Sequence, residues 1–108
     1  MSNRYVFLYV TAGGAREAQR IGERLVRERL AACVNIFPVR SVCRWKGKIE
    51  RAREVVMIVK TRRSLVERVK RRILELHSYE LPCIGVFNID AGLKEFLRWI
   101  DESTGARH

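Results

Sequence analysis

The chain lacks the short motifs that identify the commonest metal sites and enzymes. Its three cysteines, Cys33, Cys43 and Cys83, are odd in number and far apart, and none forms a C-x-x-C pair. Such spacing argues against a disulfide framework or a closed zinc site and predicts free thiols in a reducing compartment. Phosphate-binding glycine motifs, a nucleophile elbow and H-E-x-x-H are also missing, and Thr11-Ala12-Gly13-Gly14 indicates a plain turn.

Paired-carboxylate chemistry and membrane insertion are not indicated either. If Glu50 and Glu54 lie on one strand, they share a face but stand about 13 Å apart, too far for a joint acid–base mechanism. We therefore expect a protein that is not an enzyme. The apolar run that begins at Tyr5 is too short for a signal peptide or a membrane span, which predicts a cytoplasmic protein without a membrane partner.

Acidic residues are few beside the basic ones: 12 Asp and Glu face 22 Lys and Arg, a net charge of +10 in 108 residues. Residues 1–108 are expected to form a single domain with a modest core. Arg and Glu alternate at helical spacing, as in Glu23 with Arg27 and Glu67 with Arg71. This interleaving favours a solvated, arginine-rich surface over a nucleic-acid interface.

The order of apolar patterns predicts an α+β fold of the ferredoxin-like, split β-α-β type. Strands are expected at 5–10, 33–37 and 83–89, helices at 15–31, after 64 and after 92, and a bulge or break at Pro38. Ser64-x-x-Glu67 predicts a capping box at the start of the second helix. The order βαββαβ plus a C-terminal helix makes an antiparallel sheet with both main helices on one face.

A long hairpin from Ser41 to Thr61 is the most informative stretch, and we expect it to turn at Lys46-Gly47-Lys48. Residues 50–54 are mostly charged on both faces, whereas residues 55–59 are apolar on both faces. The first half should therefore overhang into solvent and the second should be covered on both sides. Strands 5–10 and 84–89 are also apolar on both faces, so one subunit cannot cover its sheet and a homo-oligomer follows.

Several separated motifs resemble the CutA family, the divalent-cation tolerance proteins, over nearly the whole chain. They are Leu30-Ala31-Ala32-Cys33-Val34-Asn35-Ile36, Ser41 with Trp45-x-Gly47-Lys48-Ile49-Glu50, Glu54 before Lys60-Thr61, His77-x-Tyr79-Glu80-x-Pro82, and Leu97-x-Trp99-Ile100. The resemblance implies a cytoplasmic homotrimer with a PII-like architecture and a role in copper or other divalent-metal tolerance. The chain departs from the family at Gly13-Gly14 and Ser78, where proline is usual, and at Cys43, where tyrosine is common.

His77, Glu80 and Cys83 are the predicted metal ligands, because imidazole, carboxylate and thiolate suit Cu(II) and other divalent ions. The competing interpretation is that His77 donates to a backbone carbonyl and Glu80 forms an ion pair. Trp45, Glu50, Lys60 and Tyr79 match positions that the family retains, and they are expected in a ligand pocket or at a subunit interface.

Three functions follow as hypotheses: a non-enzymatic trimer that binds metal or senses a small ligand, a nucleic-acid-binding protein, and a purely structural trimer. The second would use the hairpin over residues 40–53 as a β-ribbon with Trp45 stacked on a base. Its charge would come from Arg40, Arg44, Lys46, Lys48, Arg51 and Arg53.

Overall fold

A computed structural model describes residues 4–106 and contains the predicted order of elements. Along the chain these are β1 (Tyr5–Ala12), α1 (Ala15–Arg27), β2 (Cys33–Trp45), β3 (Lys48–Arg62), the 3₁₀ turn η1 (Arg63–Leu65), α2 (Val66–Leu76), β4 (Ile84–Asn88) and α3 (Lys94–Ser103). The strands form one antiparallel sheet in the order β2-β3-β1-β4. The ferredoxin-like α+β prediction is confirmed.

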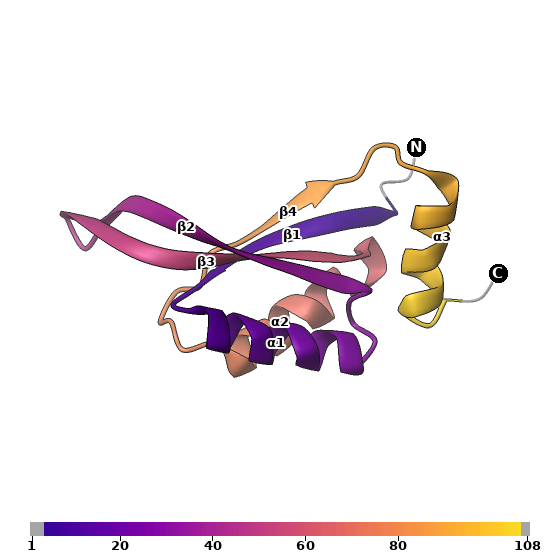
Figure 1. Cartoon of the computed structure of the whole chain (residues 1–108), viewed down its shortest axis with the longest axis horizontal. Coiled ribbons are helices and arrows are strands. Elements are labelled where there is room, and N and C mark those ends of the chain that lie inside the picture. Colours follow the sequence, from indigo (N-terminus) through magenta and orange to yellow (C-terminus); the bar gives the residue numbers. More distant parts are fainter. Residues whose placement is uncertain (1–3, 107–108) are drawn as a thin grey trace.

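One face of the sheet packs on α1 and α2, and Figure 1 shows both helices on the same side. Strand β1 explains this arrangement, because Val6, Leu8 and Val10 alternate along it and all are fully buried. They join Ile21 of α1 and Ile73 of α2 in the core. The buried side of β1 and the apolar faces of the two helices therefore pack together in one apolar layer.

The opposite face of the sheet carries a second apolar surface. Pairing of Tyr9 with Ile58 and of Phe7 with Phe87 places these side chains together on the face away from the helices. Phe37 lies on the same face, with 41% of its surface exposed, and Phe87 is 58% exposed. An uncovered apolar surface of this kind is what the sequence indicated for a subunit of an oligomer.

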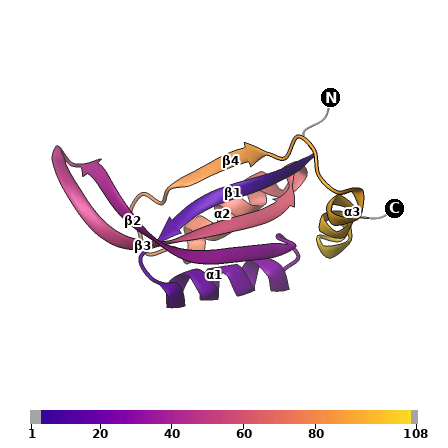
Figure 2. The same ribbon diagram turned by 45° about the horizontal axis from the view of Figure 1, so that its top comes forward.

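The hairpin of β2 and β3 is long and extends well beyond the helices (Figures 1 and 2). Its pairing runs without a shift from Cys33 opposite Lys60 to Trp45 opposite Lys48. Lys46 and Gly47 turn the chain with φ values of 51° and 80°, as a tight hairpin turn requires. The overhang raises the radius of gyration to 14.5 Å, against about 13 Å for a compact domain of similar length.

Pro38 neither breaks nor bulges this hairpin, contrary to the sequence-based expectation. It pairs with Val55 inside one continuous strand. Because β2 is an edge strand, a residue without an N–H can be accommodated where it faces away from the partner strand.

Three element boundaries also differ from the expectation. Helix α1 ends at Arg27 rather than residue 31, because Arg29 adopts a positive φ of 59° and the chain reverses there. The predicted capping box is wrong: Ser64 accepts a hydrogen bond from Arg62, and α2 begins two residues later, after η1. Strand β4 starts at Ile84, which leaves Cys83 in the preceding loop.

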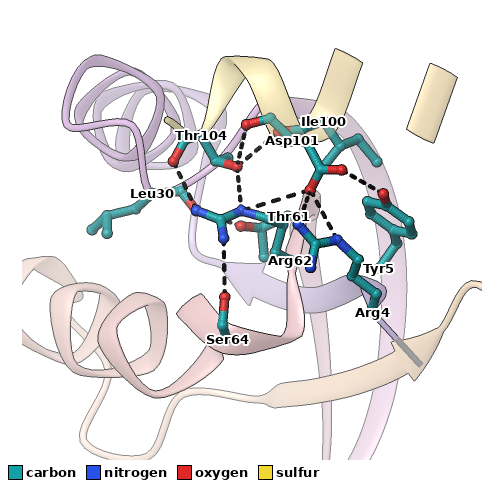
Figure 3. Close-up of polar contacts among 9 residues, drawn as sticks. All are labelled: Arg4, Tyr5, Leu30, Thr61, Arg62, Ser64, Ile100, Asp101 and Thr104. Atoms are coloured by element: carbon teal, nitrogen blue, oxygen red, sulfur yellow. Dashed lines mark hydrogen bonds and ion pairs between the residues drawn. The ribbon is translucent and has the colours of Figure 1, made fainter. Parts of the chain in front are cut away.

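Helix α3 is attached to the far end of the sheet by a buried carboxylate (Figure 3). Asp101 accepts hydrogen bonds from Arg4 at 3.2 and 3.0 Å and from the Tyr5 hydroxyl at 2.5 Å. Arg62 lies 4.0 Å from the same carboxylate and also donates to Thr104. These contacts connect α3 to the start of β1 and the end of β3.

Candidate functional site

A cleft of about 590 Å³ lies between the hairpin overhang and the loop that joins α2 to β4. Its size falls within the range of small-ligand sites. The residues that line it come from three segments: Thr11 at the end of β1, residues 41–54 of the hairpin, and residues 78–83 of the loop. They are Thr11, Ser41, Cys43, Arg44, Trp45, Glu50, Ala52, Glu54, Ser78, Tyr79, Glu80, Leu81 and Cys83.

Strand alternation explains which hairpin side chains reach the cleft. Cys43 pairs with Glu50 and Trp45 with Lys48, so their side chains lie on the sheet face opposite the helices. Glu54, four residues from Glu50, lies on that face too. The cleft is therefore continuous with the apolar sheet face described above, and it adds carboxylates and a thiol to that face.

His77 holds the loop in place beneath the cleft. It ends α2, and its side chain is fully buried. Its Nδ1 accepts a hydrogen bond from the Tyr79 N–H at 3.0 Å, so Nε2 carries the proton and donates to the Thr11 carbonyl at 2.7 Å. Both ring nitrogens thus have partners, and the backbone-carbonyl interpretation of His77 describes this geometry.

Glu17 gives the loop a further contact. Its carboxylate accepts a hydrogen bond from the Ser78 N–H at 2.8 Å and lies 3.9 Å from the His77 ring. Burial alone would raise the pKa of Glu17, but hydrogen bonds from Ser78 and Gly13 and the nearby His77 together lower it more, so the pKa lies below its usual value. Glu17 therefore remains ionised and keeps the start of the loop on α1.

Tyr79 joins the loop to the hairpin across the cleft. Its hydroxyl donates to the Glu54 carboxylate at 2.7 Å. Burial and this hydrogen bond raise the pKa of the Tyr79 phenol to about 12. Tyr79 is consequently neutral in physiological solution and acts as a hydrogen-bond donor.

The rim of the cleft is more exposed. Lys46 Nζ lies 3.7 Å from a Glu80 carboxylate oxygen and 5.6 Å from the centre of the Trp45 ring. Such an exposed ion pair contributes little to stability. Cys43 and Cys83 are free and exposed, so their thiols are accessible from solvent.

Five of the seven predicted site residues line the cleft: Trp45, Glu50, Tyr79, Glu80 and Cys83. His77 lies beneath it. Lys60 is elsewhere, because it stands six residues from Glu54 along β3, about 20 Å away; its Nζ lies 5.9 Å from the centre of the Phe96 ring.

The predicted metal ligands do not form a ready-made site. Within residues 4–106, no group of three or more His, Cys, Asp or Glu side chains is close enough to hold an ion. His77 is turned toward Thr11 and Tyr79, while Glu80 and Cys83 stay exposed on the loop.

Sequence reasoning did not assign Glu54, Thr11 or Cys43 to the site. A signal existed for Glu54, since it has the same strand parity as Glu50 and belongs to the motif before Lys60-Thr61. The role of Thr11 could not be predicted from the sequence, because its carbonyl accepts a hydrogen bond from His77, a residue 66 positions away along the chain.

Comparison with known proteins gives consistent results. The family model described as "CutA1 divalent ion tolerance protein" matches residues 6–103. The divalent-cation tolerance protein CutA of Archaeoglobus fulgidus is 53% identical over 97 residues, which cover 90% of this chain and 95% of that protein.

Solved structures show the same fold. A structure of the A. fulgidus protein superposes with a TM-score of 0.91 at 51% identity and covers 93% of this chain and 98% of that one. The CutA structure from Synechococcus elongatus gives a TM-score of 0.92 at 30% identity, with 96% and 93% covered.

The expectation of a cytoplasmic location is contradicted by these comparisons. The A. fulgidus protein of known structure is described as periplasmic. A short apolar run and unpaired cysteines were therefore not sufficient grounds for assigning a compartment. In the part of the chain that the structure describes, none of the helices has the length and apolar character needed to cross a membrane.

Proposed function

This chain belongs to the CutA1 divalent ion tolerance family, and from that premise we propose that it is a non-enzymatic protein that binds a divalent cation at the hairpin cleft of a homotrimer. The ion is cargo in this proposal rather than a resident cofactor. Residues 1–108 act as one domain and supply one cleft per subunit.

The donor chemistry of the cleft is the observation that carries this proposal. Three carboxylates, from Glu50, Glu54 and Glu80, and two thiols, from Cys43 and Cys83, line the same cleft. Carboxylate oxygen and thiolate sulfur are ligands of Cu(II), Zn(II) and related ions, and copper binds most strongly in the usual order of affinities. Both cysteines are free and exposed, so a metal ion in solution can reach their thiols.

In this proposal His77 positions the binding loop and is not itself a metal ligand. Its two hydrogen bonds fix the loop that carries Tyr79, Glu80 and Cys83. Coordination by His77 would require breaking one of those bonds within a buried setting, which is costly. We therefore assign the binding to the exposed donors and the preorganisation to His77.

Assembly is part of the proposal, because the donors of one described chain are not gathered closely enough to hold an ion. The apolar face carrying Phe7, Phe37 and Phe87 continues directly into the cleft. A subunit that covers this face would approach the hairpin and close the cleft on its open side. Burial of such aromatic residues is a strong driving force for association.

A small organic ligand is a second candidate for the same cleft. The cleft volume and the exposed ring of Trp45 would also accommodate a planar molecule. Such a ligand would make the trimer a sensor in the manner of PII proteins.

Zinc titration by calorimetry tests the metal proposal without oxidising the thiols. We expect the double variant C43S/C83S to bind Zn(II) at least about tenfold more weakly than the unmodified protein. C33S is the matched control, because Cys33 is also a free thiol but pairs with Lys60 at the far end of the hairpin. Equal losses in both variants, or no zinc binding by the unmodified protein, would contradict the proposal.

A further inference from the structure

The hairpin overhang has a second face, opposite the cleft, that is rich in arginine. The pairing places Arg40 directly across from Arg53, and Val42 across from Arg51. Alternation puts these side chains on the helix side of the sheet, whereas Glu50 and Glu54 lie on the cleft side. Charges that alternate along the sequence are thus separated by face in the structure.

These arginines lack the counter-charges found elsewhere on the surface. Among the residues described, the guanidinium groups of Arg40, Arg51 and Arg53 have no hydrogen-bond or ion-pair partner, and these residues pair through their backbone alone. By contrast, Arg24 and Arg72 both bind the Glu28 carboxylate. Two like charges directly opposite each other destabilise a strand pair. The hairpin therefore carries an electrostatic cost that an external anion would relieve.

The geometry concentrates the charge. Arg51 and Arg53 are two residues apart, about 6.6 Å along the strand, and Arg40 lies across the ladder about 5 Å from Arg53. Val42 and Ile49 are exposed beside them, by 70% and 56%. This part of the hairpin extends clear of α1 and α2 (Figures 1 and 2), so a large partner can reach it.

We propose that this arginine face, made of Arg40, Arg51 and Arg53, docks on the phosphate backbone of a nucleic-acid duplex. The net charge of +10 and the absence of acidic strand residues on this face supply the charge complementarity. A two-stranded ribbon has the dimensions that the major groove admits. Trp45 lies on the cleft side, so base stacking by Trp45 has no part in this mode of binding.

The face is independent of the proposed metal site. It lies on the helix side of the hairpin, while the cleft and the apolar surface expected between subunits lie on the other side. Arg44 borders the cleft and is left out of the variant described next for that reason.

Fluorescence anisotropy with a labelled mixed-sequence DNA duplex of about 30 base pairs tests the proposal. Three phosphate contacts predict a slope of log K against log salt of about −2.7 per hairpin engaged, or about a 40-fold loss between 50 and 200 mM salt. We expect R40Q/R51Q/R53Q to remove most of that slope and the affinity with it. R16Q/R68Q/R71Q makes the same change in net charge on exposed helix residues and should bind as the unmodified protein does.

Three results would overturn the proposal. The first is no duplex binding at about 50 mM salt, where phosphate contacts are strongest. The second is equal weakening in both triple variants, which would indicate diffuse attraction rather than this face. The third is unchanged duplex binding in R40Q/R51Q/R53Q together with lost binding to vesicles of phosphatidylcholine and phosphatidylserine, which would assign the face to a lipid surface. Native mass spectrometry of each variant confirms that its assembly is intact.

Discussion

The substitution Asp101→Asn should loosen α3 from the sheet, and its effect on stability follows from the contacts of this side chain. Asp101 is fully buried and accepts hydrogen bonds from Arg4 and Tyr5 (Figure 3). Asparagine keeps the shape but removes the negative charge, and its single acceptor oxygen cannot replace both Oδ1, which accepts from Arg4, and Oδ2, which accepts from Tyr5. The perturbation is therefore electrostatic and local.

The loss of stability in D101N depends on how exposed to solvent each partner of Asp101 is. Arg4 is 48% exposed, so its ion pair contributes only about 0–1 kcal/mol. Arg62 is 16% exposed and would keep its Thr104 partners but lose the nearby negative charge. A hydrogen bond to a charged group contributes about 1.5–3 kcal/mol, and loss of one buried ionic partner costs more, up to about 5 kcal/mol. We expect D101N to lower the free energy of unfolding by about 3 kcal/mol.

Urea denaturation at a fixed protein concentration measures this loss, because the stability of an oligomer depends on concentration. R4Q is the matched control and should cost about 1 kcal/mol or less, since Arg4 is half exposed. Amide exchange should accelerate first in α3. A loss of unfolding free energy below about 0.5 kcal/mol in D101N, or an equal loss in R4Q, would show that the buried charge of Asp101 does not hold α3 in place.

Three further predictions concern other parts of the chain. Thr61→Val should lower the free energy of unfolding, measured by urea denaturation, by about 1–3 kcal/mol, because the buried Thr61 hydroxyl donates to the Leu30 carbonyl at 2.6 Å. An unchanged free energy of unfolding would show that this carbonyl finds another donor. Gly47→Ala should lower the free energy of unfolding by about 1 kcal/mol, because Gly47 has a φ of 80°, which a residue with a Cβ atom adopts only with strain. Unchanged stability would contradict this turn geometry. Glu54→Gln should lower the Tyr79 pKa from about 12, which ultraviolet titration against a Tyr79→Phe control detects. The pKa of Tyr79 in the folded protein is raised above the usual value of about 10, so this tyrosine stabilises the protein below pH 10 and the contribution is lost as pH rises toward 12. A free energy of unfolding that stays constant between pH 10 and 12 in the unmodified protein would count against the Glu54 contact.

The fold was largely predictable because its signals are periodic. The helical stripes of Ala18, Ile21 and Leu25 and of Leu65, Val69 and Ile73, set between the apolar runs at 5–10 and 55–59 and the one that follows Pro82, predict a sheet with both main helices on one side. Boundaries were less accurate, because the end of α1 depends on a left-handed Arg29 and the start of α2 on a 3₁₀ turn. Neither has a strong local sequence signal.

The site was predictable only in part, for a similar reason. The motifs predicted two separate groups, Glu80 and Cys83 among the metal ligands and Trp45, Glu50 and Tyr79 in a ligand pocket or at an interface, and the structure brings these five residues to one cleft. The engagement of both His77 nitrogens could not, because one partner is the backbone of a strand 66 residues away. Separation of charge between the two hairpin faces likewise requires the register, which fixes Arg40 opposite Arg53.

Native mass spectrometry of untagged protein purified without chelators, before and after one equivalent of Zn(II) per chain, shows whether the assembled protein holds a divalent cation at the hairpin cleft. We expect a trimer that retains or takes up one metal ion per chain, and C43S/C83S should remain a trimer but lose the metal. A trimer that stays free of metal, or a chain that remains monomeric, would contradict the proposal that assembly completes a cation site at the hairpin cleft.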